Sequence, residues 1–242
     1  MRQINLREVA REQRQANPDL YSPDLDRRYK AAINVHRTSL GKKWPLGCSG
    51  AANAFLALIG PSMGGAIRGE TVGRGGASRP YRHSMDIGRD VMSFDWGDQR
   101  ITRWTRLCSA MLGGERYVSA LTALLNLDWR HSTNERDIPT QELLTGFDGY
   151  VWPLLGQIRP RIVSPLTNLV WDTMLSKVEP LRVSFSVCPV PLPREPIIFR
   201  SPGSDFNTML IKPHNHPSRH FLTNHMISDV GRACEWFLNQ AN

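Results

Sequence analysis

At 242 residues, the chain is long enough for one large α/β domain or two small ones with a buried core. Its 30 Lys and Arg residues exceed 22 Asp and Glu residues, and a formal net charge of +8 favours polyanionic partners, although ordinary soluble basic proteins share this balance. The longest uncharged stretch, 51–67, is broken by Gly and Pro, and the four cysteines stand singly, which excludes a membrane span and the CxxC spacing of zinc and iron–sulfur sites. The first residues lack the apolar run of a signal peptide, and isolated thiols are typical of a reducing compartment, so we expect a cytoplasmic protein.

The chain begins with a basic extension over 1–45, followed by an α/β domain over 46–242. The extension holds ten Lys or Arg and five Asp or Glu residues, and is either a helical arm packed on the domain or an additional phosphate-contacting surface. Residues 53–60 form an apolar run that predicts a strand buried on both faces. Six glycines and four arginines over 64–82 predict a long loop.

The rest of the chain alternates between strands and helices. We expect a helix over 99–112, a strand over 117–129 that enters a polar loop at Asn126, a helix over 140–160, a strand and then a helix over 161–175, a strand over 208–213 and an amphipathic helix over 224–240. This alternation predicts a three-layer αβα fold around a central, mainly parallel four-stranded sheet.

Loops at the carboxyl ends of parallel strands carry the function in such a sheet. Three loops qualify: "GPSMGG" (60–65), "NLDWRHSTNE" (126–135) and "HNHPSRH" (214–220). The small residues of the first loop would let a ligand approach the backbone closely, although Gly-Pro-Ser is also an ordinary turn.

The segment 64–82 could hold phosphates, because guanidinium groups match phosphate oxygens and glycines let the chain follow a nucleic-acid backbone. Its arginines are Arg68, Arg74, Arg79 and Arg82. Tyr81 offers a planar face for stacking on a base. A solvated loop, with Tyr81 as its hydrophobic anchor, is the alternative.

The histidines of 214–216 point to the same side of a strand exit. They could ligate a metal, completed by His220, His225 or Asp128. However, Pro217 follows immediately and no carboxylate stands at ligand spacing, so we expect neither a metal nor another cofactor.

Two other interpretations of the last loop remain. A neutral imidazole could donate a hydrogen bond to a developing anion while Ser218 and Arg219 contact phosphate. Alternatively, these are surface histidines in a basic loop.

Taken in order over 52–240, these motifs resemble those of the uracil-DNA glycosylase superfamily. Residues 60–64 are similar to the first motif of that family and His216-Pro217-Ser218 to the last. In between, "GETVGRGGASRPYR" looks like the glycine-rich stretch before the base-stacking aromatic, here Tyr81, "ALTALLNLDWR" like the strand that carries the base-reading asparagine, and "RPRIVSPLTNLVW" like the third strand.

The resemblance implies a DNA-binding monomer that flips a base out of the stack and cleaves its bond to deoxyribose. His216 would stabilise the negative charge on the pyrimidine O2, and the first loop would orient base and water. The base-binding residues would be Gly60, Pro61, Met63, Gly64, Tyr81 and Asn126. The DNA backbone would be gripped by Ser218 and Arg219 with the arginines of 64–82, and Arg219 or His220 would enter the duplex as a wedge.

The chain also departs from the family pattern at the water-activating position. Ser62 stands where the best-known branches have Asp or Asn, and a hydroxyl can position water but is a poor general base. Asp128, Glu70 and Asp86 are the possible replacements.

The base-reading position departs as well: direct alignment brings Ala123 there, with Asn126 three residues later. Gly64 stands where some branches have a tyrosine that excludes 5-substituted pyrimidines. We therefore expect a glycosylase for a modified pyrimidine, for example the glucosylated hydroxymethylcytosine of phage DNA, acting in phage defence or repair. The alternatives are excision of uracil, a non-catalytic nucleic-acid binder of the same fold, and a metal-dependent hydrolase.

Overall fold

The fold is described from a computed structural model in which residues 48–50, 54–63, 99–114, 121–131, 138–201, 205–216 and 222–240 are placed. The predicted basic extension over 1–45 and the arginine-rich segment 64–82 lie outside the described residues. Within the described part of the chain, no helix has the length and apolar character needed to cross a bilayer.

A six-stranded sheet forms the middle of the molecule, in the order β1-β3-β2-β4-β6-β5. Its strands are β1 (Cys48–Gly50), β2 (Leu56–Met63), β3 (Thr122–His131), β4 (Ile162–Pro165), β5 (Ile197–Arg200) and β6 (Asn207–Leu210). The four inner strands are parallel, which confirms the predicted mainly parallel sheet. The two edge strands were not predicted, and both pair in antiparallel fashion.

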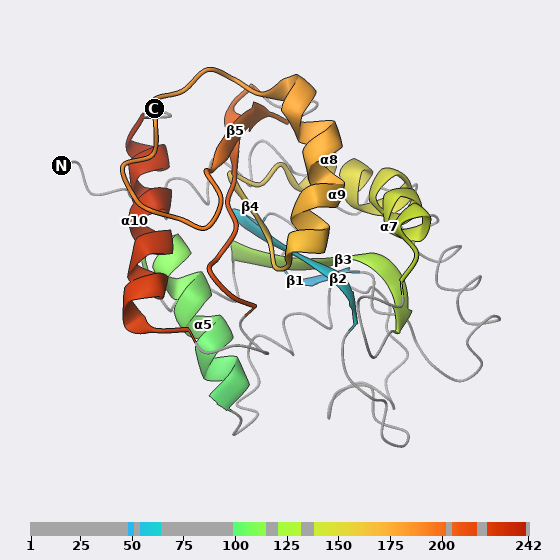
Figure 1. The fold of residues 1–242 in the computed structure, drawn as a ribbon, viewed down its shortest axis with the longest axis horizontal. Coiled ribbons are helices and arrows are strands. Elements are labelled where there is room, and N and C mark those ends of the chain that lie inside the picture. Colours follow the sequence, from blue (N-terminus) through green and yellow to red (C-terminus); the bar gives the residue numbers. More distant parts are fainter. Residues whose placement is uncertain are drawn as a thin grey trace.

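Helices cover both faces of this sheet. They are α5 (Gln99–Leu112), α7 (Thr140–Gly146), α8 (Trp152–Ile158), α9 (Asn168–Val178) and α10 (Asn224–Gln240), with a π-helical turn η3 (Phe147–Val151) between α7 and α8 and a 3-10 turn η4 (Glu179–Leu181) after α9. Helices α5 and α10 lie side by side on one face, and α7, α8 and α9 lie on the other (Figure 1). The predicted three-layer αβα fold is therefore confirmed.

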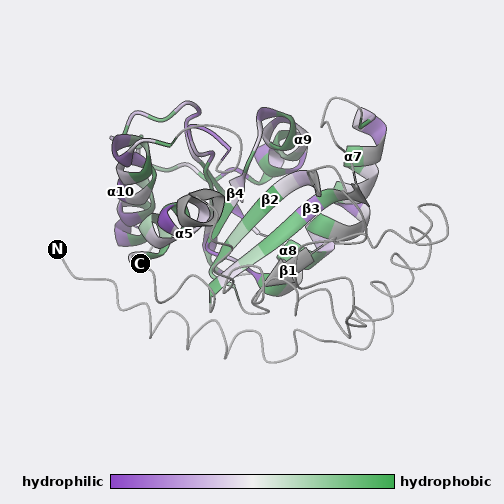
Figure 2. Ribbon diagram, turned by 90° about the horizontal axis from the view of Figure 1, so that it is seen from below, coloured by the Kyte–Doolittle hydropathy of each residue, from purple (hydrophilic) through white to green (hydrophobic). Residues whose placement is uncertain are grey.

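Two apolar cores, one on each face, hold the layers together. Along β2, Ala57 and Ile59 point into the core under α7, α8 and α9, while Leu56 and Leu58 point into the core under α5 and α10. All four residues are fully buried, and β2 and β3 are apolar over much of their length and more polar towards one end (Figure 2). A strand buried on both faces needs this nearly continuous apolar sequence.

Strands β2 and β3 end later in the sequence than predicted. The first strand was expected to end at Gly60, and a polar loop was expected to begin at Asn126, but β2 continues to Met63 and β3 to His131. Gly60 pairs with Asn126 and Ser62 with Asp128, before the register shifts at the end of β2. Ladder hydrogen bonds join backbone groups, so small and polar residues extend a strand whose neighbour continues beside it.

Helices α5 and α10 approach one another closely at Gly231. A Cβ atom at this position would lie 3.0 Å from the Ala110 carbonyl oxygen and 3.3 Å from the Ala110 Cβ. We expect Gly231→Val to lower the free energy of unfolding by about 1–3 kcal/mol, because the branched side chain forces the helices apart. In the matched control Gly149→Ala, a Cβ has nothing within 4 Å, and no loss is expected. Urea denaturation measures both variants, and an unchanged midpoint for Gly231→Val would contradict this packing.

Candidate active site

The carboxyl ends of β2 and β6 lie at the same edge of the sheet. Leu56, Ile162 and Met209 form one row across the parallel strands β2, β4 and β6. From this row, β2 runs on to Met63, and β6 runs in the same direction to Leu210, after which the chain continues to His216. After β2 the chain forms β3 on one side of β2, and it then forms β4 on the other side. This change of direction makes the edge a topological switch point, where α/β proteins bind ligands.

Gly60 and Asn126 meet at this edge. They are partners in the β2–β3 ladder, and Asn126 is buried. A Cβ atom on residue 60 would lie 2.7 Å from the Asn126 Oδ1, so only glycine leaves room for the amide. Residues two positions apart on a strand point to the same face, so Gly60 shares a face with Leu58, and Asn126 shares a face with Leu124. Both of these leucines pack on the α5 side. The amide therefore lies on the α5 face of the sheet, directly against the first motif.

His216 also packs against α5. Its ring meets the Trp104 ring edge-on, with centroids 5.6 Å apart and an interplanar angle of 87°. His216 is half-buried, and Trp104 lies on the apolar stripe that predicted the helix. An edge-on aromatic contact restrains the orientation of the imidazole while leaving part of it accessible.

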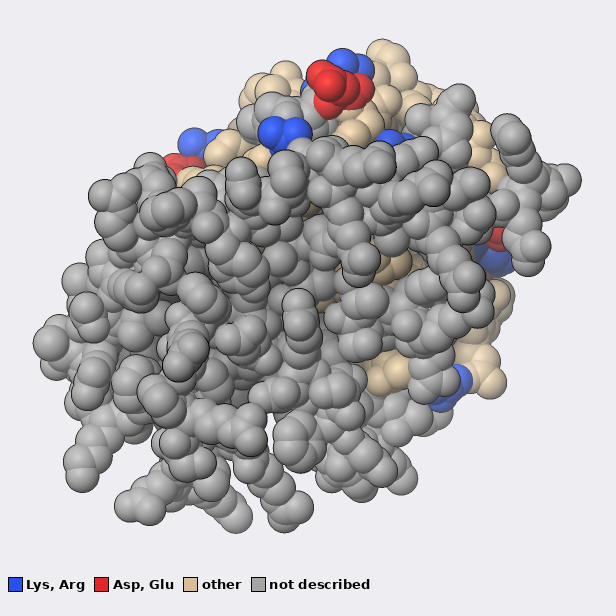
Figure 3. All heavy atoms as spheres, turned by 180° about the vertical axis from the view of Figure 1, so that it is seen from behind, with Lys and Arg blue, Asp and Glu red and all other residues tan. Residues whose placement is uncertain are grey.

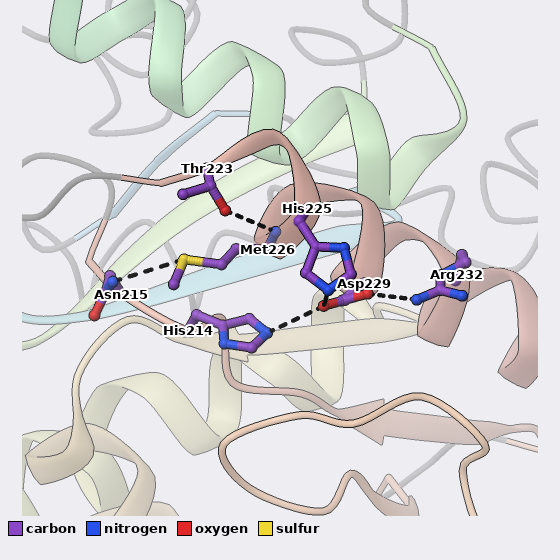
Figure 4. A network of polar contacts seen from close by, with 7 residues as sticks. All are labelled: His214, Asn215, Thr223, His225, Met226, Asp229 and Arg232. Carbon is purple, nitrogen blue, oxygen red and sulfur yellow. Dashed lines mark hydrogen bonds and ion pairs between the residues drawn. The ribbon is translucent and has the colours of Figure 1, made fainter.

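Asp229 links the exit of β6 to helix α10 (Figure 4). Its carboxylate lies 3.8 Å from the His214 Nε2, 3.4 Å from the His225 Nε2 and 2.5 Å from an Arg232 guanidinium nitrogen. The hydrogen bond from Arg232 holds the pKa of this carboxyl below its usual range. Burial lowers the pKa of His214, and the Asp229 carboxylate opposes this shift.

Asp229 was not predicted as a site residue, because no carboxylate stands at ligand spacing from the histidines in the sequence. Asp229 lies fifteen residues beyond His214 and reaches it only because α10 folds back against the strand exit. A signal was present in the sequence: Asp229 stands next to Val230 and two residues from Ile227 on the apolar side of the last helix. Charged residues are seldom fully buried without a partner.

Lys212 adds a buried positive charge at the same strand exit. Its residue is 6% exposed, and its Nζ donates a hydrogen bond to the Pro213 carbonyl oxygen at 3.1 Å. Among the described residues, no carboxylate lies within ion-pair distance of this ammonium group. Burial lowers the pKa of Lys212, and the nearby Arg194 lowers it further. The nearby Asp172 acts in the opposite direction and raises this pKa.

The structure brings Gly60, Asn126 and His216 to one edge of the sheet. Ser62 and Asp128, the two predicted water-activating residues, are ladder partners, and their side chains and that of Met63 lie outside what the structure describes. Pro61 is buried beside Gly60. The other predicted site residues lie outside the described residues, and their roles stay predictions: Gly64, Arg68, Arg74, Arg79, Tyr81, Arg82, Ser218, Arg219 and His220.

No family model matches this sequence, and no curated protein matches it. The relation to uracil-DNA glycosylases therefore stays a prediction, based on the order of the motifs. Across the ranges that the structure describes, no three His, Cys, Asp or Glu side chains converge in a way that would hold a metal ion.

Proposed function

We propose that this protein is a DNA glycosylase that flips out a modified pyrimidine and hydrolyses its N-glycosidic bond. The observation that supports this most directly is the common edge of β2, β3 and β6. There Asn126 lies against Gly60, and His216 lies against Trp104 on the same face of the sheet. A carboxamide and an imidazole on one face supply a group to recognise a base and a group to stabilise it as it leaves.

The chemistry assigned to His216 is electrostatic. As the bond between C1′ and the base nitrogen breaks, its electron pair moves onto the pyrimidine, and negative charge develops on O2. An imidazole N–H that donates to O2 stabilises this charge. The edge of the Trp104 ring holds the imidazole in place, so little reorganisation is needed when the charge appears.

Water then adds to C1′ of the oxocarbenium-like sugar, which leaves an abasic site. The ladder pair Ser62 and Asp128 lies two residues beyond Gly60 and Asn126 on the same two strands. We assign the positioning of this water to Ser62 and the acceptance of its proton to Asp128. A carboxylate suits proton acceptance better than a hydroxyl does near neutral pH.

Asn126 is assigned to base recognition. A buried amide offers one acceptor and two donors, and it discriminates between bases because a mismatched base would leave these groups unpaired. The contact between Asn126 and Gly60 also favours a second candidate, uracil excision, since a carboxamide can pair with the polar edge of uracil. Gly64, in the position where some branches have a tyrosine, permits a larger base, such as a glucosylated cytosine.

DNA attraction is assigned to segments outside the described residues. Residues 1–45 and 64–82 together account for the whole formal excess of positive charge. On the described surface, by contrast, Lys177 pairs with Asp148, Arg182 with Glu179 and Arg194 with Asp172. On the face in Figure 3, several Lys and Arg side chains stand beside Asp or Glu. Cationic segments of this kind bind the phosphate backbone without reading its sequence.

The deciding experiment is mass spectrometry of free bases released from duplexes that contain uracil, hydroxymethylcytosine or glucosylated hydroxymethylcytosine. We expect release of the modified cytosine, formation of abasic sites, and an unchanged rate in the presence of a chelator. Release of uracil alone would contradict excision of a modified base and would support the second candidate, uracil excision. Release of no base from any duplex would reject the glycosylase, and DNA binding without release would identify a non-catalytic binder.

A further inference from the structure

Asp229 is an anomalous residue in the apolar face of α10. Its side chain is 2% exposed, and it lies in the helix among the buried residues Ile227, Val230 and Ala233. A carboxylate is costly to bury unless charged or polar groups surround it. The residues that surround Asp229 therefore indicate its purpose.

Two of these partners come from α10 itself and do not explain the burial. Arg232 is 55% exposed and His225 is 79% exposed, at spacings of three and four residues from Asp229. The same pairs would form with a carboxylate on the outer side of the helix. The inward partner is His214, at the exit of β6, whose Nε2 is enclosed and has no hydrogen-bond partner. At 3.8 Å the attraction between the two side chains is electrostatic.

A second contact ties the same strand exit to the same helix. The Asn215 Nδ2 lies 3.9 Å from the Met226 Sδ, in the first turn of α10. The Thr223 hydroxyl accepts a hydrogen bond from the Met226 backbone N–H at 3.2 Å, which fixes the start of that turn (Figure 4). The two residues directly before His216 are thus both attached to α10.

The first turn of α10 is in turn attached to α5, since Arg106 donates a hydrogen bond to the Asn224 side chain. His216 follows the attached pair and packs against Trp104 of α5. The direction in which the chain leaves β6 therefore decides where the His216 ring lies. An error of about 1 Å in such a group lowers a rate by about 100-fold.

We propose that Asp229 is a positioning residue, which holds the strand exit through His214 and thereby places His216 against Trp104. The inference rests on the proposed function only for the reaction that His216 serves. The groups that face the carboxylate are Arg232 and His225 from α10 and His214 from the strand exit, with Lys212 acting on His214 from the strand side. Every one of them is a base or a cation, so an uncharged residue at 229 removes the attraction to all of them.

The test uses Asp229→Asn, which keeps the shape of the side chain and removes its charge, and His214→Ala, which removes the inward partner from a partly exposed position. Proton NMR of the His216 ring reports its contact with Trp104, and the His216→Gln variant identifies the resonance by its absence. In both variants we expect this resonance to move towards the position of free histidine. The single-turnover rate of base release should fall about tenfold, with the affinity for DNA changed less than about twofold.

His225→Ala is the matched control. It removes an imidazole from the same carboxylate, but from an exposed position on α10 and not from the strand exit. The His216 resonance and the rate should both stay at their wild-type values. The double variant Asp229→Asn/His214→Ala should lose no more than either single variant, because the two residues act through one contact.

The outcomes separate this inference from the proposed function. If the wild-type protein releases no base but the resonance moves in both variants, the proposed function is wrong and the positioning role stands. If the resonance stays in place in folded Asp229→Asn and His214→Ala proteins, Asp229 does not position His216, whatever the activity. A shift in His225→Ala as large as in the other two would also overturn the inference, because the effect would then be one of helix charge alone.

Discussion

Replacing His216 with alanine should lower the single-turnover rate of base release by at least about 100-fold, the usual effect of removing one donor to a developing anion. The affinity for DNA should stay within a few-fold of wild type, since phosphate contacts supply most of it and are assigned elsewhere in the chain. The stability should change little, because the ring is only half-buried at the edge of the α5 layer. Rapid-quench measurement of abasic sites and fluorescence anisotropy with labelled duplex provide the two readouts.

The control for His216→Ala is His225→Ala, which removes a mostly exposed imidazole from the neighbouring helix. It should leave both rate and affinity unchanged. If His216→Ala weakened DNA binding but left the rate intact, His216 would be a DNA contact and the charge-stabilising role would be wrong. A rate that fell equally in both variants would point to bulk electrostatics at this end of the molecule.

Periodicity alone was sufficient to predict the layers around this site. The stripes over 99–112 and 224–240 match α5 and α10 residue for residue, because an amphipathic helix carries its own boundaries in the pattern of its apolar face. The four inner strands were also predicted, since each is an apolar run. The helix expected over 140–160 is interrupted by the π-helical turn η3 and ends at Ile158.

The edge strands and the strand ends could not be predicted in this way. β1 is three residues long, too short for any period, and β5 follows a proline-rich stretch that hides it. The extension of β2 past Gly60 depends on a neighbour, β3, that lies more than sixty residues away in the sequence. Backbone pairing of that kind leaves no mark on the side chains of either strand.

The same distinction holds within the candidate site. Parallel topology alone places the first and last motifs at one edge, so their proximity follows once the strands are identified. The contact of Gly60 with Asn126 is a matter of register, and sequence alignment left Ala123 and Asn126 as alternatives. In the ladder, residue 123 pairs with Ala57, three positions before Gly60, and Asn126 is the residue at the strand end.

Gly60→Ala should have the second large effect, because the new methyl group would stand 2.7 Å from the Asn126 Oδ1 and displace the amide. We expect a loss of about 1–3 kcal/mol in stability from the overlap, and a fall of about 100-fold in the rate of base release from the displaced recognition group. Asn126→Ala alone should lower the rate similarly but leave room for a methyl group at residue 60. The double variant should therefore unfold at a higher urea concentration than Gly60→Ala, while its rate stays as low as that of Asn126→Ala. Equal stability losses from Gly60→Ala in both backgrounds would mean that the methyl group meets something other than the amide, and a rate that survives Asn126→Ala would remove this side chain from base recognition.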